Sequence, residues 1–321
     1  MKRSTVILSA CLLIVLTYAV GLTYGIGPRK VATKFNERVL TPTIARVFGP
    51  HSVLDDYVEK PCPTENVVSI AYFGQSNATN TVEPSASESF PPNLLQYDWK
   101  SQKCFAYQEP LLGADFTRGN NITYAAIELA KHSTKTVVII PFGFGPSSVL
   151  EWAYGRGATQ ESVVIKRLKE SGLSPQVFLW HQGESDVPLD NADEYIMAKV
   201  PYFQRPDKPL DKGLYRYGIT KDAYKDAMTA IVHRTLEAFP NSYFGIALVS
   251  VAPCMGRHQS WEPMREAQVE VAQADSRAFI SADSDSIIGI ENRYDTCHFS
   301  AEGARKLSEQ YFRSISALNV L

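Results

Sequence analysis

Short apolar runs alternate with longer amphipathic segments from residue 66 onward, and this alternation restricts the fold more than any other feature of the sequence. Apolar runs of strand length lie at 67–73, 136–142, 176–180 and 243–251, with a weaker run at 278–281. Runs that are apolar at nearly every position are typical of strands that are buried on both faces of a parallel sheet. The segments between these runs must therefore supply the helices that cover the two faces.

The intervening segments carry the periodicity and the caps of helices. We expect helices at 121–131, 220–239 and 263–274 and a last helix that begins after Ser300. Thr220 is suited to cap the second of these, whose Tyr224, Met228 and Ile231 recur on one face. Strands that alternate with helices predict an α/β fold, here a three-layer α/β/α domain with a flavodoxin-like parallel sheet. Ligands of such sheets bind beyond the carboxyl ends of the strands.

The first 28 residues differ in character from the rest of the chain. Lys2 and Arg3 precede a mostly apolar stretch, 6–26, that is long enough to cross a bilayer as a helix. We expect an uncleaved N-terminal membrane anchor, with a cleaved signal peptide as the alternative. The basic start of the segment predicts that the remainder is extracytoplasmic, in a periplasm or at a cell surface, or secreted if the segment is removed. We expect 29–65 to be a stalk or lead-in and 66–321 to be the folded domain.

Four of the five cysteines lie outside this segment, at Cys62, Cys104, Cys254 and Cys297. An even number of cysteines outside the cytoplasm predicts disulfides, and four cysteines allow three pairings. We favour Cys254 with Cys297, because a doubly wound sheet brings the loop after the fourth strand close to the last loop. Cys62 is then left for Cys104.

Composition excludes several classes of protein. Acidic and basic residues are balanced, 34 against 32, and well mixed, so the chain lacks the clustered basic face of a nucleic-acid-binding protein. Residues 143–145 resemble a dinucleotide loop but lack its third glycine or alanine. His181 and Glu184 lack the second histidine of a zinc-binding helix. We expect no cofactor, no metal and no nucleic-acid partner, and the sequence indicates no protein partner.

Three of the predicted post-strand loops carry polar residues suited to nucleophilic catalysis. The loop after the first strand holds Ser76, and the segment before the last helix holds Asp295 and His298. A serine nucleophile requires a base to take its proton and a third group to hold that base. Asp295 and His298 are three residues apart, so one short turn can place the carboxylate against one ring nitrogen. Glu184, in the third loop, is the alternative partner for His298, and we favour Asp295.

These loops resemble the motifs of the SGNH hydrolases, specifically the sialate O-acetylesterase-like branch of carbohydrate acetylesterases. The resemblance rests on Gly-Gln-Ser-Asn at 74–77, Trp-His-Gln-Gly-Glu-Ser-Asp at 180–186 and Asp-Thr-Cys-His at 295–298. A fourth segment, 145–152, looks like the family's Gly-Gly-Thr segment, which ends in tryptophan. Together the motifs cover the chain from about residue 66 to its C-terminus.

The resemblance implies a role for each matched residue. Ser76 would be the nucleophile, His298 the general base and acid, and Asp295 the group that orients His298. The oxyanion hole would use the backbone N–H of Ser76, the backbone N–H of Gly145 and the side-chain amide of Gln182. Pro146 replaces the second glycine of the family's segment and has no N–H, so a donor at that position is lost.

Further residues are expected to support the site or to bind substrate. Gln75, Asn77 and Glu184 lie in the matched motifs and are expected to support the catalytic residues. The stretch 187–218 has no clear periodicity and is rich in proline, which predicts a functional loop over the site. The candidate substrate contacts are Tyr202, Arg205, Tyr215, Arg216 and Trp152, and for Trp152 packing in the core is an equal alternative.

The sequence thus predicts a serine esterase that removes O-acetyl groups from a carbohydrate through an acyl-enzyme. One alternative is a glycan O-acetyltransferase that uses the same triad but transfers the acetyl group to a sugar hydroxyl. The other is a non-catalytic glycan-binding protein of the cell surface. The intact set of Ser76, Asp295 and His298 argues against the second alternative.

Overall fold

The computed structural model describes residues 53–188 and 219–321. After a short 3-10 turn at Val53–Asp56, the chain from Val58 to Leu321 forms one compact unit. The expected membrane anchor at 1–28 and most of the expected substrate loop at 187–218 lie outside the described residues. So do Tyr202, Arg205, Tyr215 and Arg216. Within the described ranges, no helix is both long and apolar enough to cross a membrane.

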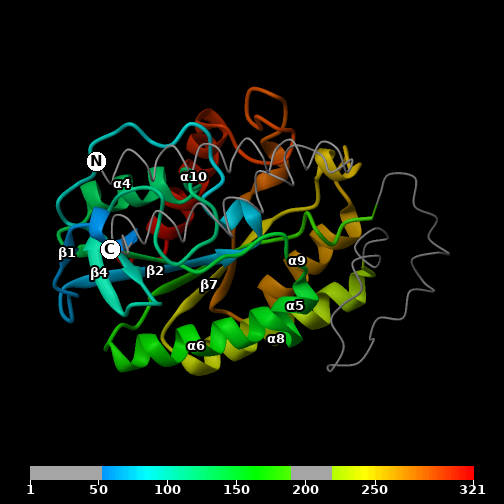
Figure 1. Ribbon diagram of the computed structural model, residues 1–321. Coiled ribbons are helices and arrows are strands. Elements are labelled where there is room, and N and C mark those ends of the chain that lie inside the picture. Colours follow the sequence, from blue (N-terminus) through cyan, green and yellow to red (C-terminus); the bar gives the residue numbers. More distant parts are fainter. Residues whose placement is uncertain (1–52, 189–218) are drawn as a thin grey trace, which may run out of the picture. The chain divides into compact units, whose positions relative to one another are not determined.

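An eight-stranded sheet forms the centre of the described part of the chain (Figure 1). Its strands are β1 (Glu59–Lys60), β2 (Val67–Gly74), β3 (Leu94–Asp98), β4 (Lys103–Ala106), β5 (Thr136–Pro141), β6 (Val177–His181), β7 (Tyr243–Leu248) and β8 (Ala278–Asp283). The helices are α4 (Thr123–His132), α5 (Val149–Tyr154), α6 (Arg156–Glu170), α8 (Lys221–Ala238), α9 (Glu262–Ala274) and α10 (Ala301–Ser316). All five apolar runs identified in the sequence are strands, and the four expected helices are present.

The spatial order of the strands is β1-β4-β3-β5-β2-β6-β7-β8. The five strands β5-β2-β6-β7-β8 are mutually parallel and follow the flavodoxin-like order 2-1-3-4-5. The α/β fold is therefore confirmed. The expectation of an all-parallel sheet is wrong at one edge, where β4 pairs antiparallel with both β3 and β1. A short turn joins β3 to β4, and so short a connection permits only an antiparallel pair.

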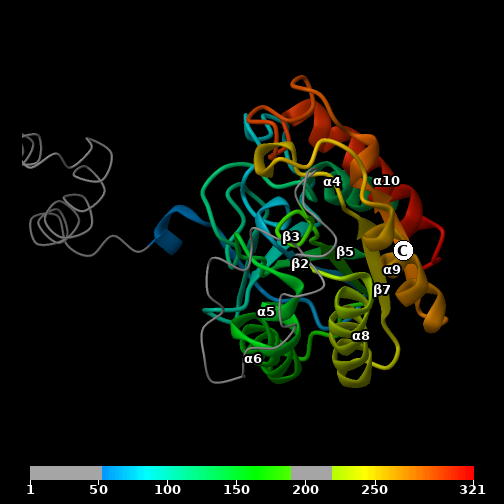
Figure 2. The same ribbon diagram turned by 90° about the vertical axis from the view of Figure 1, so that its right-hand side faces the viewer.

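Helices cover the sheet on both faces, as Figure 2 shows. In β2, Val68, Ile70 and Tyr72 pack in the core cluster that includes α4 and α10. Ala71 and Phe73 belong to the cluster beneath α5, α6, α8 and α9. Successive side chains of a strand point to opposite faces, so the mostly apolar run in β2 supplies both cores.

Local capping sets where several helices begin. The hydroxyl of Thr220 accepts the Ala223 N–H at 3.3 Å, which confirms the expected cap of α8. Ser300 caps α10 in the same way, accepting the Gly303 N–H at 3.1 Å. Neither α5 nor α6 was expected. A reciprocal pair of hydrogen bonds between Ser148 and Glu151, a capping box, begins α5.

Two disulfides join Cys62 to Cys104 and Cys254 to Cys297. The favoured pairing is thus confirmed. The first bond ties the segment after β1 to β4, so the compact unit begins several residues before the expected domain start at 66. The second ties the loop after β7 to the Asp295–His298 loop. Structural disulfides persist in oxidising compartments, so the pair indicates an extracytoplasmic protein.

Candidate active site

Ser76 lies at the abrupt change from β2 to a 3-10 turn, Ser76–Ala78. A side chain on Gly74 would come within 2.0 Å of the His181 carbonyl oxygen, and Gly74 has a φ of 137°, so only glycine fits at this turn. The Ala78 N–H donates to the Gln75 carbonyl at 2.7 Å, closing the turn. The Ala78 N–H is the first that bonds within the turn, so the N–H groups of Ser76 and Asn77 have no partner inside the turn, as at any helix start. Ser76 is partly exposed between two buried neighbours.

The position of Ser76 is the topological switch point of the sheet. Strands β2 and β6 are adjacent and parallel, with Gly74 opposite His181. From this pair the strand order runs to β5 on one side and to β7 on the other. Loops that leave neighbouring strands in opposite directions leave a crevice at their carboxyl ends, where ligands of open α/β sheets bind. The sequence-predicted loops 74–77 and 181–186 therefore meet at the carboxyl ends of β2 and β6.

Asp295 and His298 form a hydrogen-bonded pair on the turn before α10. The Asp295 Oδ2 atom lies 2.6 Å from Nδ1 of His298, and Oδ1 accepts the backbone N–H groups of Cys297 and His298 at 3.0 and 2.6 Å. Thr296, with a φ of 70°, provides the tight turn that makes this arrangement possible. Partial burial opposes ionisation of Asp295, but the hydrogen bonds from His298 and Cys297 keep its pKa below the ordinary value. With Nδ1 donating to the carboxylate, Nε2 is left as a proton acceptor.

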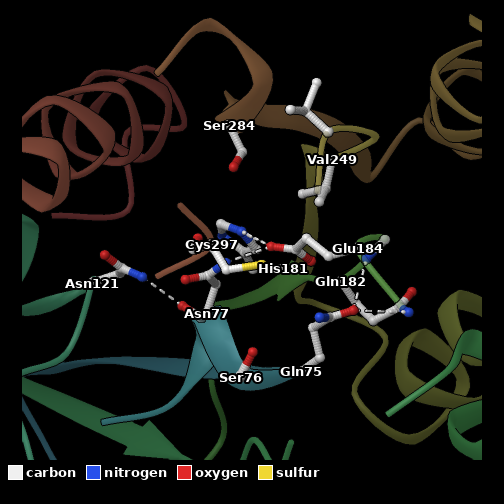
Figure 3. A network of polar contacts seen from close by, with 12 residues as sticks. Gln75, Ser76, Asn77, Asn121, His181, Gln182, Glu184, Val249, Ser284 and Cys297 are labelled. Atoms are coloured by element: carbon white, nitrogen blue, oxygen red, sulfur yellow. Dashed lines mark hydrogen bonds and ion pairs between the residues drawn. The ribbon is translucent and has the colours of Figure 1, made fainter. Parts of the chain in front are cut away.

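A buried network ties this turn to the serine loop (Figure 3). The side-chain amide of Asn77, the residue after Ser76, donates to the carbonyl of Cys297 at 3.3 Å and to Glu184 Oε1 at 2.6 Å. Arg293 donates to the same Cys297 carbonyl at 2.7 Å. His298 follows Cys297 directly, so the network fixes the position of the His298 backbone relative to Ser76.

Glu184 is the charged centre of this network. Burial raises its pKa, yet the contacts with His181 (3.5 Å) and Asn77 and the charge of Arg293 outweigh burial and lower the pKa to about 2. Its carboxylate contacts Asn77 and His181, and the His298 ring is held by Asp295. Glu184 therefore links the loop after β6 to the serine loop through Asn77.

Gln75 holds the loop after β6 against the serine loop. Its Oε1 accepts the backbone N–H groups of Gly183 and Ser185 at 3.3 and 3.0 Å, and its side chain is buried. The residue before the serine thus fixes the loop after β6, which agrees with a supporting role for Gln75.

The oxyanion role expected for Gln182 is not supported by the structure. The side chain is fully buried, and its amide nitrogen donates to Ser147 O at 3.1 Å, Asp186 Oδ2 at 2.5 Å and Gln75 Oε1 at 3.3 Å. An amide has two N–H groups, and protein acceptors already occupy both. Gln182 instead joins the Ser147 backbone to the loop after β6.

Gly145 lies directly against the serine. A Cβ atom at this position would approach Cα, Cβ and N of Ser76 to within 2.8–2.9 Å, so any larger residue would displace the serine. The close approach explains the need for glycine and keeps its backbone beside the serine.

Trp152 is a core residue, so of its two expected roles the structure supports core packing and not contact with the substrate. The side chain has no exposed surface. Its ring stacks on Phe144 with centroids 4.7 Å apart and meets Phe73 and Trp180 edge to face. Its indole N–H donates to Ser147 Oγ at 2.9 Å, which satisfies its one polar atom. Trp152 therefore supports the Gly145 loop from beneath.

Two further residues shape the site, although the sequence assigned a role to neither. Arg293 is fully buried and donates to the carbonyls of Ile287, Ser284 and Cys297, which shapes the turn that carries the histidine. Asp186 lies in a matched motif but had no assigned role. It accepts the Val149 N–H at 2.7 Å and so links the start of α5 to Gln182.

Comparisons with known proteins agree with this geometry. Residues 71–203 match the model of a family described as carbohydrate esterase, sialic acid-specific acetylesterase. No match was found among curated protein sequences. A solved protein from Arabidopsis thaliana is similar in structure, with a TM-score of 0.57 and 16% identity over 78% of this chain and 98% of that chain.

Two further solved structures are similar at lower scores. NanS has 12% identity, a TM-score of 0.48 and coverage of 78% of this chain and 97% of that chain. An acetyl-xylooligosaccharide esterase from Geobacillus has 13% identity, a TM-score of 0.45 and coverage of 77% and 94%. Residues 71–203 are thus similar to this carbohydrate esterase family, and the fold of the described chain is similar to that of the Arabidopsis thaliana protein.

Proposed function

We propose that this protein hydrolyses O-acetyl esters of a carbohydrate with Ser76 as nucleophile, His298 as general base and acid, and Asp295 as the residue that orients His298. The observation that carries the proposal is the 2.6 Å contact between Asp295 and Nδ1 of His298, on a turn that Asn77 ties to the serine loop. The arrangement leaves Nε2 of the histidine as the acceptor for the serine proton.

The reaction runs in two halves. The Ser76 oxygen attacks the acetyl carbonyl while its proton moves to Nε2 of His298. The bond to the sugar oxygen then breaks, and the histidine returns the proton to that oxygen. Water, deprotonated by the same nitrogen, attacks the acetyl-serine, and acetate leaves with the serine oxygen reprotonated.

The negative charge that develops on the carbonyl oxygen requires nearby donors. We assign this role to the backbone N–H of Ser76, at the start of its 3-10 turn, and to the backbone N–H of Gly145. Loss of one such donor typically costs about 3–4 kcal/mol in the transition state. Both donors belong to the backbone, so the rigid packing of Gly145 on Ser76 sets their positions.

The direct test is covalent labelling together with acetate release. A fluorophosphonate probe should modify Ser76, located by peptide mass spectrometry, and Ser76→Ala should lose both labelling and acetate release. Ser286→Ala is a matched control, because Ser286 is an exposed serine in another 3-10 turn. A folded Ser76→Ala protein that releases acetate at the wild-type rate excludes this site.

We further propose that the segment 1–28 anchors this domain to a membrane on its extracytoplasmic side. The apolar run at 6–26 and the two disulfides support this placement. An anchored protein stays with membranes after an alkaline carbonate wash, and a release of the full-length chain by that wash contradicts anchoring.

A further inference from the structure

Residues that the catalytic mechanism does not use lie beside the serine turn. The chain segment after the serine turn pairs through an isolated bridge between Asn80 and Phe116 and through another between Glu83 and Ser300. It therefore lies next to both the 116–119 segment and the start of the last helix. The hydroxyls of Thr79 and Thr81 donate to the Ser76 carbonyl, so this segment is also fixed to the nucleophile.

Tyr294 continues this surface up to the histidine. Its ring lies nearly parallel to the His298 ring, with centroids 6.3 Å apart and an interplanar angle of 29°. Its hydroxyl donates to the Thr81 carbonyl at 3.1 Å. Arg118 lies over the Tyr294 ring at 5.2 Å and donates to the Tyr294 hydroxyl at 2.5 Å. The tyrosine therefore has a fixed position beside the catalytic base.

Phe116 bridges to Asn80 and lies two residues before Arg118, whose N–H donates to the Asn80 carbonyl, and we call Phe116, Arg118 and Tyr294 together the rim patch. The Phe116 side chain is 50% exposed, although burial would stabilise so large an apolar group. Its backbone has a φ of 65°, in the left-handed region that bulky residues rarely adopt. Such strain costs on the order of 1–3 kcal/mol and is concentrated at functional sites. An exposed aromatic ring held at this cost, one bridge away from the serine segment, is suited to bind a ligand.

The charge of the rim patch is already compensated. Arg118 forms an ion pair with Glu83, and both side chains are about half exposed, 48% and 50%. The pair offers several hydrogen-bond donors and acceptors with no net charge. A carboxylate that approached Arg118 would also meet the carboxylate of Glu83. The patch therefore favours hydroxyl groups over a negatively charged group.

We propose that the rim patch binds the sugar of the substrate and that this sugar is neutral. The inference rests on the proposed function and adds the substrate class. The apolar face of a sugar ring would stack on Phe116, and its hydroxyls would bond to the Arg118–Glu83 pair. The acetyl group would then extend past Tyr294 toward His298 and Ser76.

Kinetics on three substrates test the proposal. The substrates are an O-acetylated xylo-oligosaccharide, which is neutral, 9-O-acetyl-N-acetylneuraminic acid, which is acidic, and 4-nitrophenyl acetate, which has no sugar. Phe116→Ala should lower the ratio of kcat/KM on the neutral sugar to kcat/KM on 4-nitrophenyl acetate about two- to tenfold, mainly through KM. Tyr154→Ala is the matched control. Tyr154 is another exposed aromatic residue, at the end of α5, and its replacement should leave the ratio unchanged.

A second variant tests the charge argument. Glu83→Gln leaves the cation of Arg118 uncompensated and should raise activity on the acidic sugar relative to the neutral one. An unchanged ratio for Phe116→Ala, or a wild-type enzyme that prefers the acidic sugar and keeps that preference in Glu83→Gln, overturns the inference.

Binding separates this inference from the catalytic proposal. The neutral oligosaccharide should bind Ser76→Ala, as measured by calorimetry, and should bind the double variant with Phe116→Ala more weakly. Binding without acetate release by the wild type would reject the proposed hydrolysis and keep the rim patch. Equal binding by both variants would reject the rim patch and keep the hydrolysis.

Discussion

The two carboxylates of the site should respond in opposite ways to replacement by their amides. Asp295 contacts the histidine ring, whereas Glu184 is buried and holds Asn77, which in turn bonds to the Cys297 carbonyl. Asp295→Asn keeps the shape of the turn but changes which tautomer of His298 is favoured. Glu184→Gln removes a buried charge from the network and leaves the histidine partner in place.

The expected magnitudes differ accordingly. An imidazole in the wrong tautomer lowers kcat roughly 10³- to 10⁴-fold in serine-type triads, so we expect a loss of that order for Asp295→Asn with little change in stability. The pKa of Glu184 is lowered from 4.5 to about 2. Such a shift corresponds to about 3 kcal/mol of folding free energy at pH 7. For a domain of this size, this free energy is equivalent to a fall in Tm of about 6–12 °C in Glu184→Gln.

The pH dependence provides the internal check. Because the folded pKa lies below the unfolded one, the stabilisation by Glu184 is complete above about pH 4.5 and is lost as the pH falls toward 2. Urea unfolding of the wild type and Glu184→Gln should therefore show a gap of about 3 kcal/mol at pH 7 and about 2 kcal/mol at pH 3.5.

Steady-state kinetics on 4-nitrophenyl acetate complete the comparison. Glu184→Gln should lose far less kcat than Asp295→Asn, because the imidazole keeps its partner. If Glu184→Gln is inactive but as stable as the wild type, while Asp295→Asn stays active, the triad must be rewritten with Glu184. A stability gap that does not change with pH would refute the role of the ionised carboxylate.

Three further predictions follow from contacts beside the site. Replacing Cys254 and Cys297 together by serine should cost about 2–4 kcal/mol of stability and also lower kcat, because the bond holds the histidine loop, whereas removal of the other disulfide should affect stability alone; urea unfolding and kinetics distinguish the two. Burial raises the pKa of Asp186 from 3.8 to about 7. The stability of the wild type should therefore fall relative to that of Asp186→Asn as the pH rises from 4 to 7, as measured by Tm. Parallel curves of Tm against pH for the two proteins would contradict this prediction. Trp152→Phe should lower Tm with no selective rise in KM for sugar over 4-nitrophenyl acetate, as expected of a core residue; a sugar-specific KM effect would restore its substrate contact.

The sequence determined the central part of the fold because the signals there are local. The run 67–73 in β2 is apolar at six of its seven positions, and such a run is stable only when buried on both faces. Thr220 and Ser300 cap their helices with their own hydroxyls, a bond that needs no tertiary contact. The Asp295–His298 pair was predictable for the same reason, since one turn spans its three-residue spacing.

Other features depended on contacts between distant segments. The strands β1 and β4 at one end of the sheet are short, so their apolar content alone is too weak to identify them. Gln182 was assigned to the oxyanion hole from its motif. Its N–H groups instead bond to Ser147, which is distant in the sequence, and to Asp186, which had no assigned role. Burial of Trp152 likewise depends on where α5 packs.

The rim patch could not be predicted from the sequence either. Phe116, Arg118 and Tyr294 belong to segments separated by up to 178 positions (294 − 116), and no spacing rule connects them. The bridge from Asn80 to Phe116 and the stacking of Tyr294 beside His298 exist only in the folded chain. Local periodicity and caps therefore determine the elements and the catalytic turn, whereas hydrogen bonds and packing between distant loops decide which side chains face the substrate.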